Sequence, residues 1–114
     1  MVKLRRARRA RAVSGIEVRL TAERWRHIVN RHPELTPFHA AVLQTIGSPD
    51  LVAKGLVGEL IAVKRIPHVP FKAKYLVVAY KELQTGDGFV ITAHFISNAE
   101  RLLRREVVWR KKFY

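Results

Sequence analysis

Residues 20–35, LTAERWRHIVNRHPEL, decide how the first half of this chain folds. Thr21 is typical of a helix N-cap, because its hydroxyl can accept a hydrogen bond from a first-turn N–H group. Leu20 and Trp25 have the spacing of a hydrophobic staple across that cap. Pro33 disfavours the helical conformation at the residue before it, so we predict a helix over about residues 22–32. Its packed face follows the i, i+3, i+4, i+7 rule and consists of Trp25, Ile28, Val29 and His32.

Length and composition indicate one globular domain. The chain has 114 residues, of which 48% are hydrophobic, which is enough for one modest core. It has no cysteine, so disulfides and thiolate metal sites are excluded. No apolar run approaches the roughly 18–20 residues that a membrane span needs, and no apolar signal segment follows the basic N-terminus. We therefore expect a cytoplasmic protein with no membrane partner.

Charge is the strongest global signal in the sequence. Lys and Arg number 22 against 9 Asp and Glu, which gives a formal net charge of +13. Such an excess attracts polyanions by counterion release, and RNA, with DNA as an alternative, is the expected partner. Other interpretations are a ribosome-like packing role, an anionic membrane surface, and a charge excess of no specific use. Residues 1–14 are predicted to be a flexible basic arm and residues 15–114 the folded domain.

The rest of the chain predicts a strand, two helices and then an antiparallel meander. Residues 16–20 alternate as a short strand, and Thr36 and Pro37 mark the start of a second helix that ends near Gly47. Strand-like runs follow at 51–54, 59–66, 74–81, 89–96 and 107–109, with a short helix near 99–106. The predicted fold is α+β, with a short N-terminal strand and two helices packed on a four-stranded antiparallel sheet.

Strand parity places two polar side chains of the 89–96 run on one face. The face predicted to cover the core consists of Phe89, Ile91, Ala93 and Phe95. Thr92 and His94 then lie on the opposite face, about 7 Å apart by strand rise. His27 lies between Arg24 and Arg31, so we expect it to be neutral at pH 7 and able to act as a base.

No metal and no other cofactor is predicted. His27 and His32 are separated by five residues, so they do not share a helix face as an i, i+4 pair does, and no carboxylate accompanies them at ligand spacing. His39 and His68 are predicted to be surface residues. The sequence contains neither a phosphate-cradling glycine loop nor a nucleophile elbow. The remaining His, Arg, Lys, Thr and Tyr groups suit RNA cleavage by the 2′-hydroxyl, which needs a base, an acid and a cation.

Five blocks of this sequence resemble the barnase, EndoU, colicin and RelE nuclease superfamily, and most of all its phage-associated branch. The blocks are RLTAERWRHIVNRHPEL (19–35), SPDLV (48–52), KYLVVAYK (74–81), GFVITAHF (88–95) and VVW (107–109). The resemblance covers about residues 16–109. It implies helices followed by a four-stranded antiparallel sheet and a metal-independent ribonuclease activity. The positions it carries over are His27, His32, Lys74 and Thr92, whereas His94 departs from the tyrosine that is more typical in this block.

The first functional hypothesis is a metal-independent endoribonuclease, toxin- or phage-associated. His27 is the predicted base, and either His32 or His94 is the predicted acid. Lys74 and Arg31 are predicted to stabilise the phosphate, and Thr92 to orient it.

The alternative hypothesis is a non-catalytic basic nucleic-acid-binding protein. The cations predicted to bind nucleic acid are Arg5, Arg6, Arg8, Arg9, Arg24, Arg31, Arg65, Arg110, Lys111 and Lys112. A third hypothesis is that this chain acts by binding another protein in a toxin–antitoxin pair, the expected partner being an acidic antitoxin or an immunity-type protein.

Overall fold

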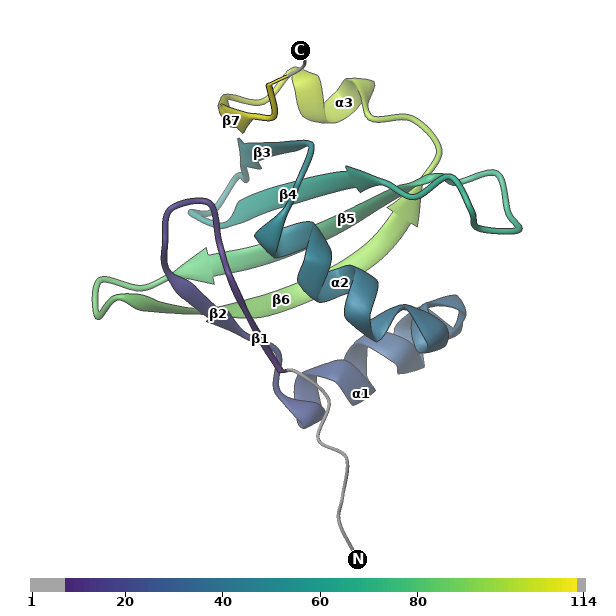
Figure 1. The fold of residues 1–114 in the computed structure, drawn as a ribbon, viewed down its shortest axis with the longest axis horizontal. Helices are drawn as coiled ribbons and strands as arrows, with labels where there is room; N and C mark the ends of the chain where they lie inside the picture. The colour runs from purple at the N-terminus through teal and green to yellow at the C-terminus, as the bar shows by residue number, and fades with distance from the viewer. Residues whose placement is uncertain (1–7, 113–114) are drawn as a thin grey trace, which may run out of the picture.

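A curled, seven-stranded mixed sheet forms the body of the protein (Figure 1). The computed structural model describes residues 8–112. The strand order is β1-β2-β6-β5-β4-β3-β7, and all neighbours are antiparallel except β2 and β6. The predicted four-stranded antiparallel sheet with two helices packed on it is therefore wrong. The sheet is larger, half-barrel-like and mixed, and three short α-helices accompany it.

The elements follow one another as a strand pair, a helical segment and a long meander. The strands are β1 (Arg9–Arg11), β2 (Glu17–Arg19), β3 (Leu51–Lys54), β4 (Leu60–Arg65), β5 (Tyr75–Glu82), β6 (Asp87–Ile96) and β7 (Val107–Arg110). The helices are α1 (Ala22–Arg31), the 3-10 helix η1 (Pro33–Phe38), α2 (His39–Gly47) and α3 (Glu100–Leu103). Among the described residues, no helix has the length and apolar character needed to cross a membrane.

Part of the predicted basic arm belongs to the sheet. Arg9–Arg11 form the edge strand β1, which pairs with β2 through Ala10 and Val18. The disorder expected for residues 1–14 therefore does not extend to this strand, because its backbone finds a partner in β2 and Ala12 after it is buried. The predicted arm residues Arg5 and Arg6 lie outside the described residues.

The helical segment begins as predicted and continues differently. The Thr21 hydroxyl accepts a hydrogen bond from the Arg24 N–H at 3.1 Å, which confirms the N-cap. Residues 33–38 form η1, in which the Thr36 hydroxyl donates to the Pro33 carbonyl at 2.7 Å. The predicted helix start at Thr36 is wrong. The Thr36 hydroxyl donates to a preceding carbonyl instead of capping a following helix, and α2 begins only at His39.

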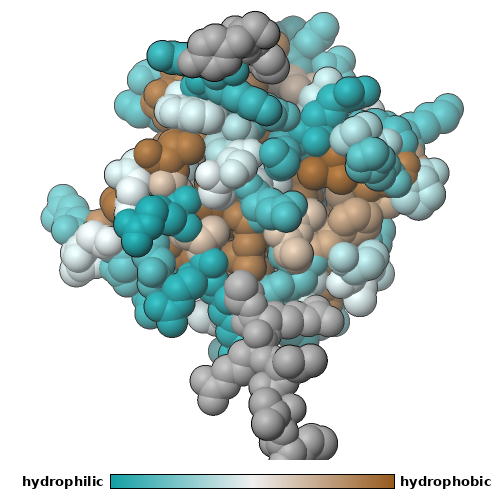
Figure 2. All heavy atoms as spheres, viewed as in Figure 1, coloured by the Kyte–Doolittle hydropathy of each residue, from teal (hydrophilic) through white to brown (hydrophobic). Residues whose placement is uncertain are grey.

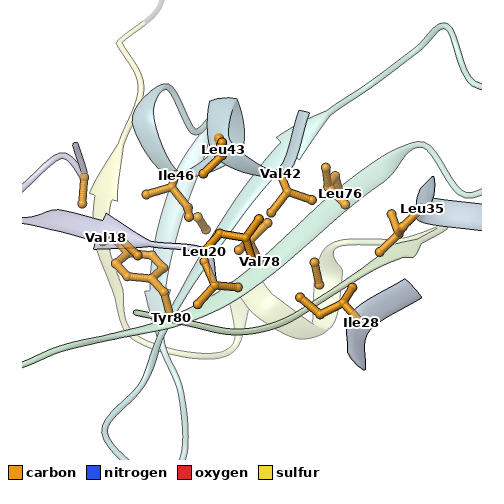
Figure 3. Close-up of a cluster of buried hydrophobic side chains, with 14 of the residues drawn as sticks. Val18, Leu20, Ile28, Leu35, Val42, Leu43, Ile46, Leu76, Val78 and Tyr80 are labelled. Atoms are coloured by element: carbon orange, nitrogen blue, oxygen red, sulfur yellow. The ribbon is translucent and has the colours of Figure 1, made fainter. Parts of the chain in front are cut away.

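The main core lies between the sheet and the α1–α2 layer (Figure 3). Side chains of α2, among them Val42 and Ile46, meet Val78 of β5, and all three are fully buried. The α1 face and the following turn add the buried Ile28 and Leu35. The register between β5 and β6 shifts at Ala79 and Tyr80, which leaves Ile91 without a Cα partner and turns Val90 into the core. The predicted core face of 89–96 is thus confirmed for Ala93 and Phe95 and wrong for Phe89 and Ile91, because the bulge reverses the alternation.

A smaller apolar cluster occupies the opposite face of the sheet. Ile61, Val63 and Val77 alternate with core residues along β4 and β5, and Leu102 of α3 packs against them. The helix α3 therefore covers the face of the sheet away from α1 and α2. Three members of this cluster, Ile61, Val77 and Leu102, also form the apolar wall of a groove that is described below.

Candidate active site

Helix α1 lies beside the part of the β6 edge that β2 does not cover. β2 pairs only with Asp87, Gly88 and Phe89 of β6. Beyond this point α1 takes the place of a neighbouring strand and contacts β6 (Figure 1). His32, which ends α1 as its C-cap, thereby reaches the second half of β6.

His32 and His94 form a stacked pair at this edge. Their ring centroids lie 5.7 Å apart, with an angle of 26° between the ring planes. The His32 Nδ1 atom is 3.9 Å from the Glu34 Oε2 atom. The His32 side chain is 34% exposed, so one ring of the pair can be reached from solvent.

The environment of His94 favours its neutral form. Burial lowers the pKa of His94, the neighbouring His32 lowers it further, and the Glu34 carboxylate opposes both effects. A histidine with a lowered pKa is unprotonated at neutral pH and can accept a proton. The stacked pair therefore offers one ring that is ready to act as a base.

His94 also lines a groove on the outer face of the sheet, beside α3. The groove has a volume of about 460 Å³, and its apolar wall includes Ile61, Val77 and Leu102. Arg101 of α3 and Arg105, just after that helix, add two guanidinium groups to its lining. Thr92 pairs across from Ala79, which lines the groove, while His94 pairs across from Val77. The prediction that Thr92 and His94 share a face is therefore confirmed.

Two of the predicted catalytic residues lie apart from this pair. The Lys74 ammonium donates a hydrogen bond to the Val69 carbonyl at 2.6 Å and so holds the loop before β5. His27 is exposed and lines a depression of about 450 Å³ whose other lining residues all belong to α1 and its cap, Arg24 among them. The structure brings His27 together with Arg24, as predicted, but not with Thr92 or His94.

The predicted binding cations are spread over helix α1, the end of β4 and the two edges of the sheet. Arg9 on β1 is paired with Glu17 at 2.8 Å, and Arg8 beside it is exposed. The remaining ones, Arg31, Arg65, Arg110, Lys111 and Lys112, are also exposed. Figure 2 shows hydrophilic side chains in teal around most of the outline of the face that carries α1 and α2.

Arg101 and Arg105 are not among the site residues predicted from the sequence, and the predicted position of one histidine is wrong. The run RLLRRE at 101–106 carries Arg101 and Arg105, and this spacing on a short helix was the available signal. His39, predicted to be a surface residue, is only 9% exposed and stacks edge-on against Trp25 at 4.8 Å. The prediction failed because α2 begins at this residue and turns its first side chain towards α1.

Within residues 8–112, no three His, Cys, Asp or Glu side chains gather in a way that could hold a metal ion. Comparisons of the chain with protein-family models, with curated proteins and with solved structures give no significant match.

Proposed function

We propose that this protein is a metal-independent endoribonuclease in which His94 and His32 are the acid–base pair. The observation that supports the proposal is the stacking of these two rings, one of which, His94, lines a groove that also carries arginines. A base and an acid must each come within about 3 Å of an oxygen of the same phosphodiester. Two rings whose centroids are 5.7 Å apart can meet that requirement together.

The proposed reaction uses the RNA's own nucleophile. Neutral His94 removes the proton of a 2′-hydroxyl, and this oxygen attacks the adjacent phosphorus. The bond from phosphorus to the 5′-oxygen breaks, and protonated His32 donates its proton to the leaving oxygen. The products are a 2′,3′-cyclic phosphate and a 5′-hydroxyl. Glu34 is placed to pair with the His32 imidazolium before this transfer.

Cationic side chains near the pair support the same reaction. Negative charge builds up on the phosphorane oxygens, and fixed positive charge stabilises it. Arg101 and Arg105 lie in the groove that His94 also lines, so they are the proposed source of that charge. Thr92, on the same face as His94, is proposed to orient the phosphate.

The test is cleavage of total RNA in EDTA by wild type, His94→Ala, His32→Ala and His68→Ala proteins purified in parallel. His68 is an exposed loop histidine, so it is the matched control. We expect the first two substitutions to lower kcat by about 10²–10⁴-fold, the usual contribution of a positioned acid or base. The fragments should carry 2′,3′-cyclic phosphates, whereas His68→Ala should cleave like wild type. Intact RNA with folded wild type, or equal cleavage by all four proteins, would contradict the proposal.

His27→Ala separates this assignment from the one predicted from sequence. Because His27 lies in a depression made only by α1 and its cap, its removal should weaken RNA binding and leave kcat within about threefold of wild type. A loss of kcat as large as that of His94→Ala would instead indicate that His27 is the base.

A non-catalytic nucleic-acid-binding protein is the second candidate. The observation that favours it is the wide distribution of exposed cations over the described residues, from Arg8 to Lys112. It predicts salt-sensitive RNA binding without cleavage, unchanged by His94→Ala. The same four proteins distinguish the two candidates.

A further inference from the structure

We infer that the groove beside α3 holds one unstacked nucleobase of single-stranded RNA, with the adjoining phosphate on Arg101 and Arg105. The inference rests on the proposed function and names the form of substrate that the same site would take.

The lining of the groove has the character of a base-binding pocket. Ile61, Val77 and Leu102 give it an apolar wall on which a flat ring can lie, and its volume of about 460 Å³ is within the range of small-ligand sites. Ser97 and Asn98 complete one side with hydroxyl and amide groups. The side-chain Oδ1 atom of Asn98 accepts a hydrogen bond from the Glu100 N–H at 2.8 Å. The Asn98 amide N–H₂ group remains as a donor for the edge of a base.

The charge of the rim favours an anion attached to that base. In the described part of the chain, neither Arg101 nor Arg105 has an acidic side chain within ion-pair distance. One carboxylate does act on Arg105: the pKa of Glu59 is lowered, first by hydrogen bonds from the Val57 and Glu59 N–H groups and in smaller part by Arg105 and Lys81. Two guanidinium groups against one ionised carboxylate leave the rim positive, which suits one phosphate.

Geometry restricts the substrate to single-stranded RNA. A base that is paired and stacked in a duplex cannot turn its face onto a groove wall, whereas an unpaired base can. His94 lines this groove and stacks on His32, so a base seated here would bring its own phosphodiester to the pair. The groove would then select unpaired nucleotides for cleavage.

The test measures binding of mononucleotides, which contain no cleavable internucleotide bond. Adenosine 5′-monophosphate, adenosine and inorganic phosphate are titrated separately into the full chain, and methyl NMR shifts are followed. We expect the mononucleotide to shift the methyl signals of Ile61, Val77 and Leu102 and to bind more tightly than either fragment. Ala79→Leu, which fills the groove, and Arg101→Glu should each weaken this binding at least fivefold.

Arg104→Ala is the matched control, because Arg104 belongs to the same turn of chain but does not line the groove. It should bind the mononucleotide within twofold of wild type. Arg101→Glu also keeps the test decisive if Ala79→Leu does not fold, because Arg101 is exposed. Mononucleotide binding that both Ala79→Leu and Arg101→Glu retain, or equal affinity for inorganic phosphate alone, would overturn the inference.

The two proposals can fail separately. If mononucleotides bind in the groove but RNA stays intact, the groove assignment stands and the nuclease proposal fails. If RNA is cleaved while Ala79→Leu leaves KM unchanged, the nuclease proposal stands and the groove assignment fails. Duplex RNA cleaved as fast as single-stranded RNA of the same sequence would also contradict the inference.

Discussion

Replacing Tyr80 by phenylalanine should stabilise the protein, and the gain should grow in alkaline solution. Tyr80 is fully buried beside Val18 in the core (Figure 3), and among residues 8–112 its hydroxyl has no hydrogen-bond partner. Leaving a buried hydroxyl unpaired costs about 1–3 kcal/mol. Removing the oxygen also leaves a small void, so we expect a net gain of about 1 kcal/mol at pH 7. For a domain of this size this corresponds to about 3–6 °C in Tm.

The alkaline part of the prediction follows from the pKa of Tyr80. Burial, and in smaller part the charge of Glu82, raise this pKa from 10.0 to about 12. The folded state therefore favours the neutral phenol. This contribution to stability is fully present below pH 10 and is lost as the pH rises from 10 towards 12. Since one pKa unit corresponds to about 1.4 kcal/mol, wild type should lose about 2–3 kcal/mol relative to Tyr80→Phe over that range.

Urea denaturation of both proteins at pH 7, 9, 10, 11 and 12 measures the difference, and titrations of other residues cancel in it. Tyr75→Phe is the matched control, because Tyr75 lies on the same strand but is only half-buried. It should stay within about 0.5 kcal/mol of wild type at pH 7. A Tyr80→Phe protein that is less stable than wild type at pH 7, or a difference that stays constant from pH 7 to 12, would refute the reasoning.

Three further predictions test the close packing of β5 against β6 at Gly88, the cap of α1 and the titration of the histidine pair. Gly88→Ala should destabilise the fold by about 1–3 kcal/mol in urea, because its new Cβ would lie 2.5 Å from the Lys81 carbonyl oxygen; an unchanged midpoint would exclude this close approach. Thr21→Ala should cost about 1 kcal/mol through loss of the α1 cap, while a cost below about 0.3 kcal/mol would show that the Arg24 N–H needs no such partner. In cleavage assays, the acidic limb of kcat/KM should lie below the ordinary histidine value of about 6.5, because the pKa of His94 is lowered. Glu34→Gln should move that limb to still lower pH, because Glu34 opposes the lowering, and a shift to higher pH would contradict the role of His94 as base.

The sequence predicted the elements that local chemistry specifies. The Thr21 cap and the strand over 51–54 appear where the pattern placed them. Both depend on residues that are close neighbours along the chain. The change from a helical segment to a series of strands at residue 51 was predictable for the same reason, since it needs only the change from helical to alternating periodicity.

The size and curl of the sheet were not predictable from local patterns, because they depend on distant partners. Arg19 of β2 forms an ion pair at 2.9 Å with Asp87, the first residue of the parallel neighbour β6, and no local pattern near either residue predicts this contact. The strand β1 did leave a signal: arginine and alanine alternate over residues 9–12, and Ala12 is buried. The prediction of a flexible arm rested instead on the repulsion between the arginines of this stretch. The bulge at Ile91 is a single-residue irregularity that the alternation along β6 does not reveal.

The candidate site depends on the point where β2 stops. If β2 continued, it would cover the rest of the β6 edge, and His94 would face a strand. The Thr21 cap ends the strand and starts α1 beside β6 instead. From Ala22 to its C-cap His32, α1 advances about 15 Å, at 1.5 Å per residue. Over the same interval β6 advances about 17 Å from Phe89, the partner of Arg19, to His94. The two lengths are similar and α1 contacts β6, so the C-terminal end of the helix reaches His94, on which His32 stacks.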